Sequence, residues 1–150
     1  MKILIVSGKP HLPQAVGGVP SCTHELALEL IGRGHEVSVM CGLSTAGFTG
    51  FRVRASLKFS KYKFIRDSFQ GYPVYRQWDV RANIGDAARM LKPDVAVIQL
   101  GELVPLTREF QNHSVPTVTY LHNVEVQGFG GDLSILKGSK FISNSAFTAH

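Results

Sequence analysis

The first forty or so residues carry a strand, a glycine-bearing loop, a helix and a second strand, and no other feature constrains the fold as strongly. Lys2–Ser7 contains a continuous aliphatic run, typical of a strand buried on both faces of a parallel sheet. A helix is expected over Ser21–Ile31, with Ser21 as its N-cap and Gly32 just after its end. Glu36–Cys41 is then the second strand. This order predicts a right-handed βαβ unit.

The rest of the chain continues to alternate strands and helices. One helix is expected over Val80–Leu91, because its apolar residues share a stripe, and a shorter one near Leu103–Gln111. Further strands are expected over Tyr72–Trp78, Val95–Leu100, Pro116–Leu121 and Lys140–Ser143. The sequence therefore predicts an α/β protein: a Rossmann-like open parallel sheet with helices on both faces.

Composition is that of one soluble globular domain. The chain has 150 residues, of which 44% are hydrophobic and 18% charged, so it is too apolar and too weakly charged for a disordered protein. Its longest aliphatic runs, Ile3–Val6 and Val95–Ile98, are far shorter than the ~20 apolar residues of a membrane span. The two cysteines, Cys22 and Cys41, form no CxxC motif, which favours a reducing, cytoplasmic setting.

The net charge of +5 comes from the basic segment Phe51–Arg66, which has six basic residues and no acidic one. The rest of the chain has ten basic against eleven acidic residues. Apolar residues alternate with the basic ones, so an extended insertion is expected there. Two interpretations stay open: contact with an acidic surface, such as an anionic membrane at its cytoplasmic face or an anionic acceptor, or a solvated strand face. The six residues are Arg52, Arg54, Lys58, Lys61, Lys63 and Arg66.

Glycine and polar residues follow several of the predicted strands. Ligands of open parallel sheets bind at the carboxyl ends of the strands, so these residues are expected to line one cleft. Gly17 and Gly18 lie at the end of a loop over Gly8–Pro20, directly before a helix, where close backbone approach and free N–H groups suit a diphosphate. Glycines that merely let the chain turn explain the pair equally well. The other residues expected to line the cleft are Glu102, Asn123, Ser143 and Asn144.

His122 is the candidate catalytic residue. It follows the apolar run Val118–Leu121 and begins a loop, so its ring can donate a hydrogen bond to a substrate oxygen. The alternative is a histidine that only bonds a neighbouring backbone group. Glu102 could orient a sugar hydroxyl, but it is expected rather to cap the helix that begins at Leu103. His24 is expected on the surface, and both cysteines in the core.

Several chemistries lack their sequence motifs. The glycines do not form GxGxxG and no acidic residue ends the second strand, which argues against NAD. There is no GxxxxGK[ST] loop, no GxSxG elbow and no HExxH or His/Cys cluster with the spacing of metal ligands. No bound metal and no cofactor are expected.

The opening, MKILIVSGKPHLPQAVGGVPSCTHELALELIGRGHEVSVMC, resembles the start of glycosyltransferase family 4 proteins. Those begin with a strand, a loop ending in Gly-Gly, a helix with a Leu-Ala-Leu stripe and a Gly-His-Glu-Val turn. The later stretches LKPDVAVIQ, PTVTYLHN and KFISNSAFTA are similar to the family's later strands, in the same order. The resemblance covers nearly the whole chain apart from about Thr45–Phe69.

The resemblance implies the GT-B architecture, two Rossmann-like domains facing a cleft. Residues 1–150 would be the N-terminal, acceptor-side domain of a longer chain, inactive without the C-terminal domain that binds the nucleotide-sugar. The activity implied is retaining transfer of a sugar, of the hexosyltransferase type, from a nucleotide-sugar substrate, without a protein-held metal. Gly17 and Gly18 would approach the donor diphosphate, and His122 the donor sugar. Members often have histidine where this chain has Gln99.

The partners implied are a nucleotide-sugar donor and a carbohydrate, lipid or other acceptor, with no nucleic acid. Two other functions stay open. One is a non-catalytic nucleotide- or phosphate-binding module, and the other is the domain of a sugar epimerase with the same architecture.

Overall fold

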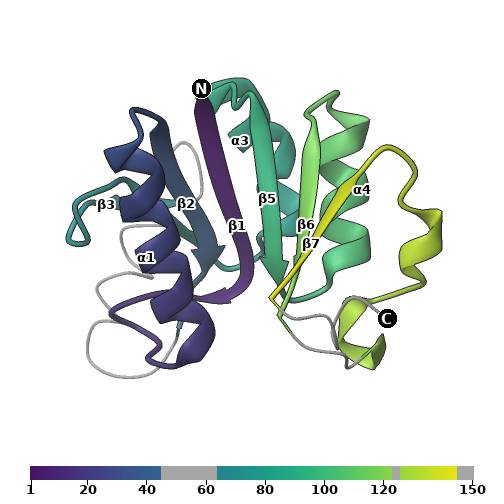
Figure 1. Ribbon diagram of the computed structural model, residues 1–150, viewed down its shortest axis with the longest axis horizontal. Helices are drawn as coiled ribbons and strands as arrows, with labels where there is room; N and C mark the ends of the chain where they lie inside the picture. Colours follow the sequence, from purple (N-terminus) through teal and green to yellow (C-terminus); the bar gives the residue numbers. More distant parts are fainter. Residues whose placement is uncertain (45–63, 123–125, 145–150) are drawn as a thin grey trace.

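The computed structural model describes residues 1–44, 64–122 and 126–144 and contains one seven-stranded sheet (Figure 1). Four strands were expected with nearly these bounds: β2 (Glu36–Gly42), β5 (Val95–Leu100), β6 (Thr117–Leu121) and β7 (Lys140–Ser143). The other three are β1 (Lys2–Pro10), β3 (Ile65–Asp67) and β4 (Val74–Gln77). The helices are α1 (Gly18–Gly32), α3 (Ile84–Leu91) and α4 (Leu103–Asn112), with 3-10 turns η1 (Arg81–Asn83), η2 (Val126–Phe129) and η3 (Leu133–Ile135).

The strand order is β3-β4-β2-β1-β5-β6-β7. All neighbours pair in parallel except β3, which runs antiparallel to β4 at one edge. The predicted class, a Rossmann-like α/β fold, is confirmed. The chain passes from β1 to β2 and β4 on one side and then returns to β5 on the other. The carboxyl ends of β1 and β5 therefore form the switch point, where sheets of this kind bind ligands.

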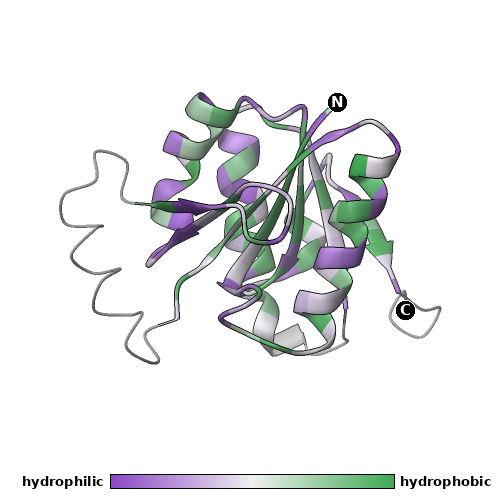
Figure 2. Cartoon of the chain, turned by 90° about the vertical axis from the view of Figure 1, so that its left-hand side faces the viewer, coloured by the Kyte–Doolittle hydropathy of each residue, from purple (hydrophilic) through white to green (hydrophobic). Residues whose placement is uncertain are grey.

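The core has two halves, one on each face of the sheet. Ile5 of β1 packs with Ala27 of α1 on one face, and Val6 packs with Ile84 of α3 and Phe110 of α4 on the other; all five are fully buried. The hydrophobic strands lie between the two helical layers (Figure 2). Burial on both faces explains why the first strand is a continuous aliphatic run rather than an alternating one.

Two predicted helices begin elsewhere than expected. Ser21 is not an N-cap: α1 begins at Gly18, with Gly17 as the N-cap, and the Ser21 N–H already donates to the Gly17 carbonyl (3.1 Å). Pro20 does not prevent this, because the first turn of a helix has no partner for its N–H groups. The helix expected over Val80–Leu91 is divided into η1 and α3, where the Asn83 side chain donates to the Asp79 carbonyl (2.7 Å).

Three glycines let the strand ends meet closely at the switch point. A Cβ added to Gly101 would lie 2.9 Å from the Gly8 Cα, and one added to Gly42 would lie 2.9 Å from the Gly8 carbonyl oxygen. Gly101 also has a φ of +96°, which strongly favours glycine. The main chains at the carboxyl ends of β1, β2 and β5 therefore pack directly against one another.

Candidate functional site

Two adjoining cavities open at the switch point, and Lys9 and Gly101 line both of them. The larger, about 340 Å³, is also lined by Trp78, Arg81 and Glu102. The smaller, about 130 Å³, is also lined by Gln99, Leu103 and Phe129. Of the described residues expected to line one cleft, Glu102 lines the larger cavity, and Gly17, Gly18, His122, Ser143 and Asn144 line neither. A single cleft shared by all of them stays a prediction. Glu102 lies at the N-cap position of α4 but makes no side-chain cap hydrogen bond, so the expectation that it caps this helix is wrong.

Gly17 and Gly18 lie at the start of α1, and both are exposed. A Cβ added to Gly18 would meet nothing within 4 Å, and one added to Gly17 would meet only Pro20, at 4.0 Å. Packing therefore does not explain the glycines. Pro20 has no N–H group, so the first-turn donors open to a ligand are the N–H groups of Gly18 and Val19. Exposed N–H groups at a helix start attract anions; binding of a diphosphate here stays a prediction.

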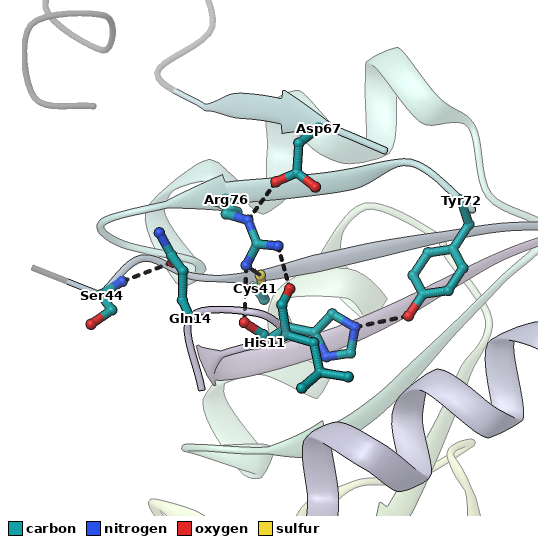
Figure 3. Close-up of polar contacts among 8 residues, drawn as sticks. His11, Gln14, Cys41, Ser44, Asp67, Tyr72 and Arg76 are labelled. Atoms are coloured by element: carbon teal, nitrogen blue, oxygen red, sulfur yellow. Dashed lines mark hydrogen bonds and ion pairs between the residues drawn. The ribbon is translucent and has the colours of Figure 1, made fainter. Parts of the chain in front are cut away.

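The loop that leads to Gly17 is fixed by a buried arginine. Arg76 of β4 is 3% exposed; its Nη1 donates to the His11 carbonyl (3.1 Å) and its Nη2 to the Leu12 carbonyl. Its Nε donates to Asp67 Oδ2 of β3 (2.6 Å) (Figure 3). The guanidinium thus ties the edge strand and the loop together. The sequence does not mark Arg76 as buried, because an arginine in a short strand beside a basic segment has the pattern of an exposed residue.

A second buried contact ties the same loop to α1. The Tyr72 hydroxyl lies 2.9 Å from His11 Nε2 and 3.0 Å from His24 Nδ1. Burial raises the pKa of Tyr72 to about 12, so the hydroxyl stays neutral, donates its proton to one ring and accepts from the other. His24 was expected on the surface, and that expectation is wrong. Of the two cysteines, Cys41 is buried as expected and Cys22 only partly so.

His11 makes the stability of the chain depend on pH. Burial, Arg76 and His24 lower the pKa of His11 from 6.5 to about 4. Between these pH values the unfolded chain binds a proton that the folded chain does not, so the free energy of unfolding should fall as the pH drops. At ~1.4 kcal/mol per pKa unit, the loss is about 3 kcal/mol. Denaturant titrations across this range measure it. The His11→Gln variant, which cannot titrate, should show a smaller slope; equal slopes would contradict the assignment.

His122 lies at the carboxyl end of β6 and is partly buried. Its Nε2 lies 3.3 Å from Gln99 Oε1, and its ring lies over that of Tyr120, with centroids 4.1 Å apart. Gln99 of β5 donates in turn to the hydroxyl of Thr23, which donates to the Val19 carbonyl (2.8 Å). Both Gln99 and Thr23 are 2% exposed. A chain of side chains therefore runs from the first turn of α1 across β5 to His122.

The remaining predicted residues divide into three groups. Asn144 donates to the His122 carbonyl (3.2 Å), so the two are together, and Ser143 ends β7 and lines a groove of about 430 Å³ with Leu121 and Phe141. Arg66 is exposed on β3, at the edge of the sheet opposite β7, and does not reach the switch point. Contact of the basic segment with an acidic surface stays a prediction. Residues outside the described ranges are Asn123, Arg52, Arg54, Lys58, Lys61 and Lys63.

In the part of the chain that the structure describes, none of the helices combines the length and apolar character needed to cross a membrane. Over the same ranges, no three or more His, Cys, Asp or Glu side chains gather in a way that could hold a metal ion.

No known protein family matches the sequence, and no curated protein matches it either. Among solved structures, the chain is similar to an alpha-glucosyltransferase in complex with UDP and a 13-mer DNA containing an HMU base. The two share 17% sequence identity at a TM-score of 0.52, over 95% of this chain and 37% of the other. The chain therefore spans little more than a third of that protein. At this identity the likeness shows a glycosyltransferase-like fold alone.

Proposed function

We propose that the chain is the N-terminal, acceptor-side domain of a retaining glycosyltransferase that resembles family 4 and uses a nucleotide-sugar donor. The observation that carries the proposal is the chain of hydrogen bonds from Val19 through Thr23 and Gln99 to His122. These hydrogen bonds link the exposed start of α1, where the diphosphate would bind, with His122 at the carboxyl end of β6. In the proposed protein, a second Rossmann-like domain holds most of the donor.

Sugar transfer from a nucleotide breaks a bond between the sugar and a phosphate oxygen. Negative charge grows on the leaving diphosphate, and the sugar becomes cationic in the transition state. The N–H groups of Gly18 and Val19 would stabilise the diphosphate, because donors fixed before the reaction cost no reorganisation when charge develops. His122 would hold a sugar hydroxyl and so orient the reacting carbon. No protein nucleophile and no bound cofactor enter this scheme.

The acceptor belongs, in this proposal, in the larger cavity at the switch point. Trp78 is 45% exposed beside it, and an exposed indole offers a flat apolar face to a sugar ring. Lys9, Arg81 and Glu102 add polar contacts around that cavity. A carbohydrate or lipid-linked acceptor suits this lining. The similar solved structure holds DNA, so DNA is one of the acceptors to test.

Transfer is tested by incubating the whole protein with labelled nucleotide-sugars and a panel of carbohydrate, lipid and DNA acceptors. A glycosylated product supports the proposal. Nucleotide binding without any product would favour a binding module, and an altered free sugar would favour an epimerase.

The diphosphate site is tested by a pair of charge substitutions on one helix. Gly18→Asp places a carboxylate at the start of α1, and Gly32→Asp places one at its end; a Cβ meets nothing within 4 Å at either position. Like charges about 4 Å apart repel by about 4 kcal/mol near a protein surface, so Gly18→Asp should weaken donor binding at least about tenfold, measured by calorimetry. An acidic residue stabilises a helix N-terminus, so this loss cannot be attributed to unfolding. Equal affinities in the two variants would contradict the site.

A further inference from the structure

We propose that Gln99 is a positioning residue: held by Thr23, it fixes His122 as the neutral tautomer with its proton on Nε2 and leaves Nδ1 to accept a hydrogen bond from a ligand hydroxyl. The tautomer follows from the geometry of this chain alone. Only the identification of the hydroxyl as one of the donor sugar rests on the proposed function.

The orientation of the Gln99 amide follows from Thr23. A hydroxyl has one proton, and Thr23 donates it to the Val19 carbonyl, at 2.8 Å. The Thr23 oxygen can therefore only accept from Gln99, so the NH2 group of the amide faces Thr23 and the carbonyl oxygen faces His122. With the amide turned round, two acceptors would face each other in a buried site, which is costly.

The orientation of Gln99 fixes the proton of His122. Gln99 Oε1 has no proton to give and lies 3.3 Å from His122 Nε2, so Nε2 must carry the hydrogen and donate. In a neutral ring Nδ1 is then an acceptor. Nδ1 has no hydrogen-bond partner among residues 1–44, 64–122 and 126–144. Burial lowers the pKa of His122, which keeps the ring neutral, and the Tyr120 ring packed against it limits its rotation.

This assignment reverses the direction expected from the sequence, where His122 was to donate to a substrate oxygen. A ring that accepts through Nδ1 selects ligands that present an O–H group and disfavours a bare carbonyl or phosphate oxygen, since two acceptors would meet there. Specificity for a hydroxyl would thus originate at Thr23, which lies on the other side of Gln99 from the ligand.

The tautomer is measured by NMR of the chain with nitrogen-15 in its histidines, above the pKa of His122 and without any ligand. The His122 signals are assigned by their loss in His122→Asn. We expect a pyrrole-type signal for Nε2 and a pyridine-type signal for Nδ1, with a population ratio of up to about tenfold from one buried hydrogen bond. A protonated Nδ1 or an even mixture in the unsubstituted chain would overturn the proposal.

Variants of the two supporting residues test the relay itself. Thr23→Val removes the acceptor that orients Gln99 and should move His122 toward a mixture of tautomers, whereas Thr23→Ser keeps the hydroxyl and should not. Gln99→Met should have the same effect as Thr23→Val. If Thr23→Val leaves the His122 spectrum unchanged, Thr23 does not hold Gln99 and the relay is refuted.

The ligand side is tested with the transfer assay of the whole protein. An asparagine can place its amide oxygen near the position of Nδ1, while a glutamine reaches only toward Nε2. His122→Asn should therefore keep more kcat than His122→Gln, by about tenfold for one hydrogen bond; the reverse order would overturn the acceptor role. If the tautomer is as expected and the unsubstituted protein transfers no sugar, the proposed function fails and the role of Gln99 stands.

Discussion

Replacing Arg76 with methionine is expected to lower the free energy of unfolding by about 3–5 kcal/mol, the usual cost of breaking a buried ion pair from one side. Arg76→Met preserves the bulk of the side chain but leaves the Asp67 carboxylate, 13% exposed, without its cation. It also removes the guanidinium donor from the Leu12 carbonyl and from the His11 carbonyl, although the latter still accepts from the Gln14 and Ala15 N–H groups. Urea denaturation of the variant and the unsubstituted chain measures the difference.

The matched control is an arginine in an exposed ion pair. Arg33 lies 2.8 Å from Glu29 on the surface of α1, and both side chains are more than half exposed, at 69% and 63%. Pairs of this kind contribute at most about 1 kcal/mol, so Arg33→Met should change stability little. In Asp67→Asn combined with Arg76→Met, the loss should be smaller than the sum of the single losses, because the two residues interact directly. A loss below about 1 kcal/mol in Arg76→Met would contradict the role assigned to this residue.

Removing the His122 side chain should produce the largest effect on activity. If this ring orients the donor sugar as the bond to phosphate breaks, His122→Ala should lower kcat and kcat/KM together, by about 10²–10³-fold. Steady-state kinetics with the whole protein test this, and thermal unfolding of the same sample shows whether the variant is folded.

The control for His122→Ala is another partly buried histidine away from the cleft. His35 precedes β2 at the amino-terminal edge of the sheet, opposite the strand ends that form the switch point. His35→Ala should leave both kinetic constants within about twofold of the original, since surface substitutions remote from a site rarely exceed 0.5 kcal/mol. Full activity in His122→Ala would show that this residue does not belong to the site. Gly17 and Gly18 would then be the only residues still assigned to donor binding.

The sequence was informative where the signal is local. The aliphatic run of β1, the turn that ends α1 and the bounds of β5 and β7 are all set by residues next to one another in the chain. The topology of a parallel sheet also brings its strand ends to one edge, so cavities at the switch point could be expected from the sequence. His122 and Asn144 were placed at that edge by this argument, and the structure brings them into contact.

What the sequence could not supply are contacts whose partners lie far apart along the chain. Arg76 can be buried because the loop after β1 places the His11 and Leu12 carbonyls beside its guanidinium. The residue pattern of β4 alone does not reveal this distant contact. His24 is partly buried for the same reason, through Tyr72. Gln99 stands out in the sequence as a departure from the family that the sequence resembles, but its role depends on Thr23, which is buried against it in α1.

The close approach of Gly8 and Gly101 has a consequence for how the cavity could change during evolution. The part of the cavity that these glycines line is main chain, and it presents the same amide groups whatever side chains surround it. A side chain at Gly101 would collide with the backbone of Gly8, so substitutions cannot change this part of the cavity wall. Trp78, which follows β4, and Arg81 of η1 line the same cavity, are exposed and can vary without disturbing the strands. Descendants of this protein would therefore come to bind new ligands by exchanging these outer residues, while the close contact of the strand ends would be inherited unchanged.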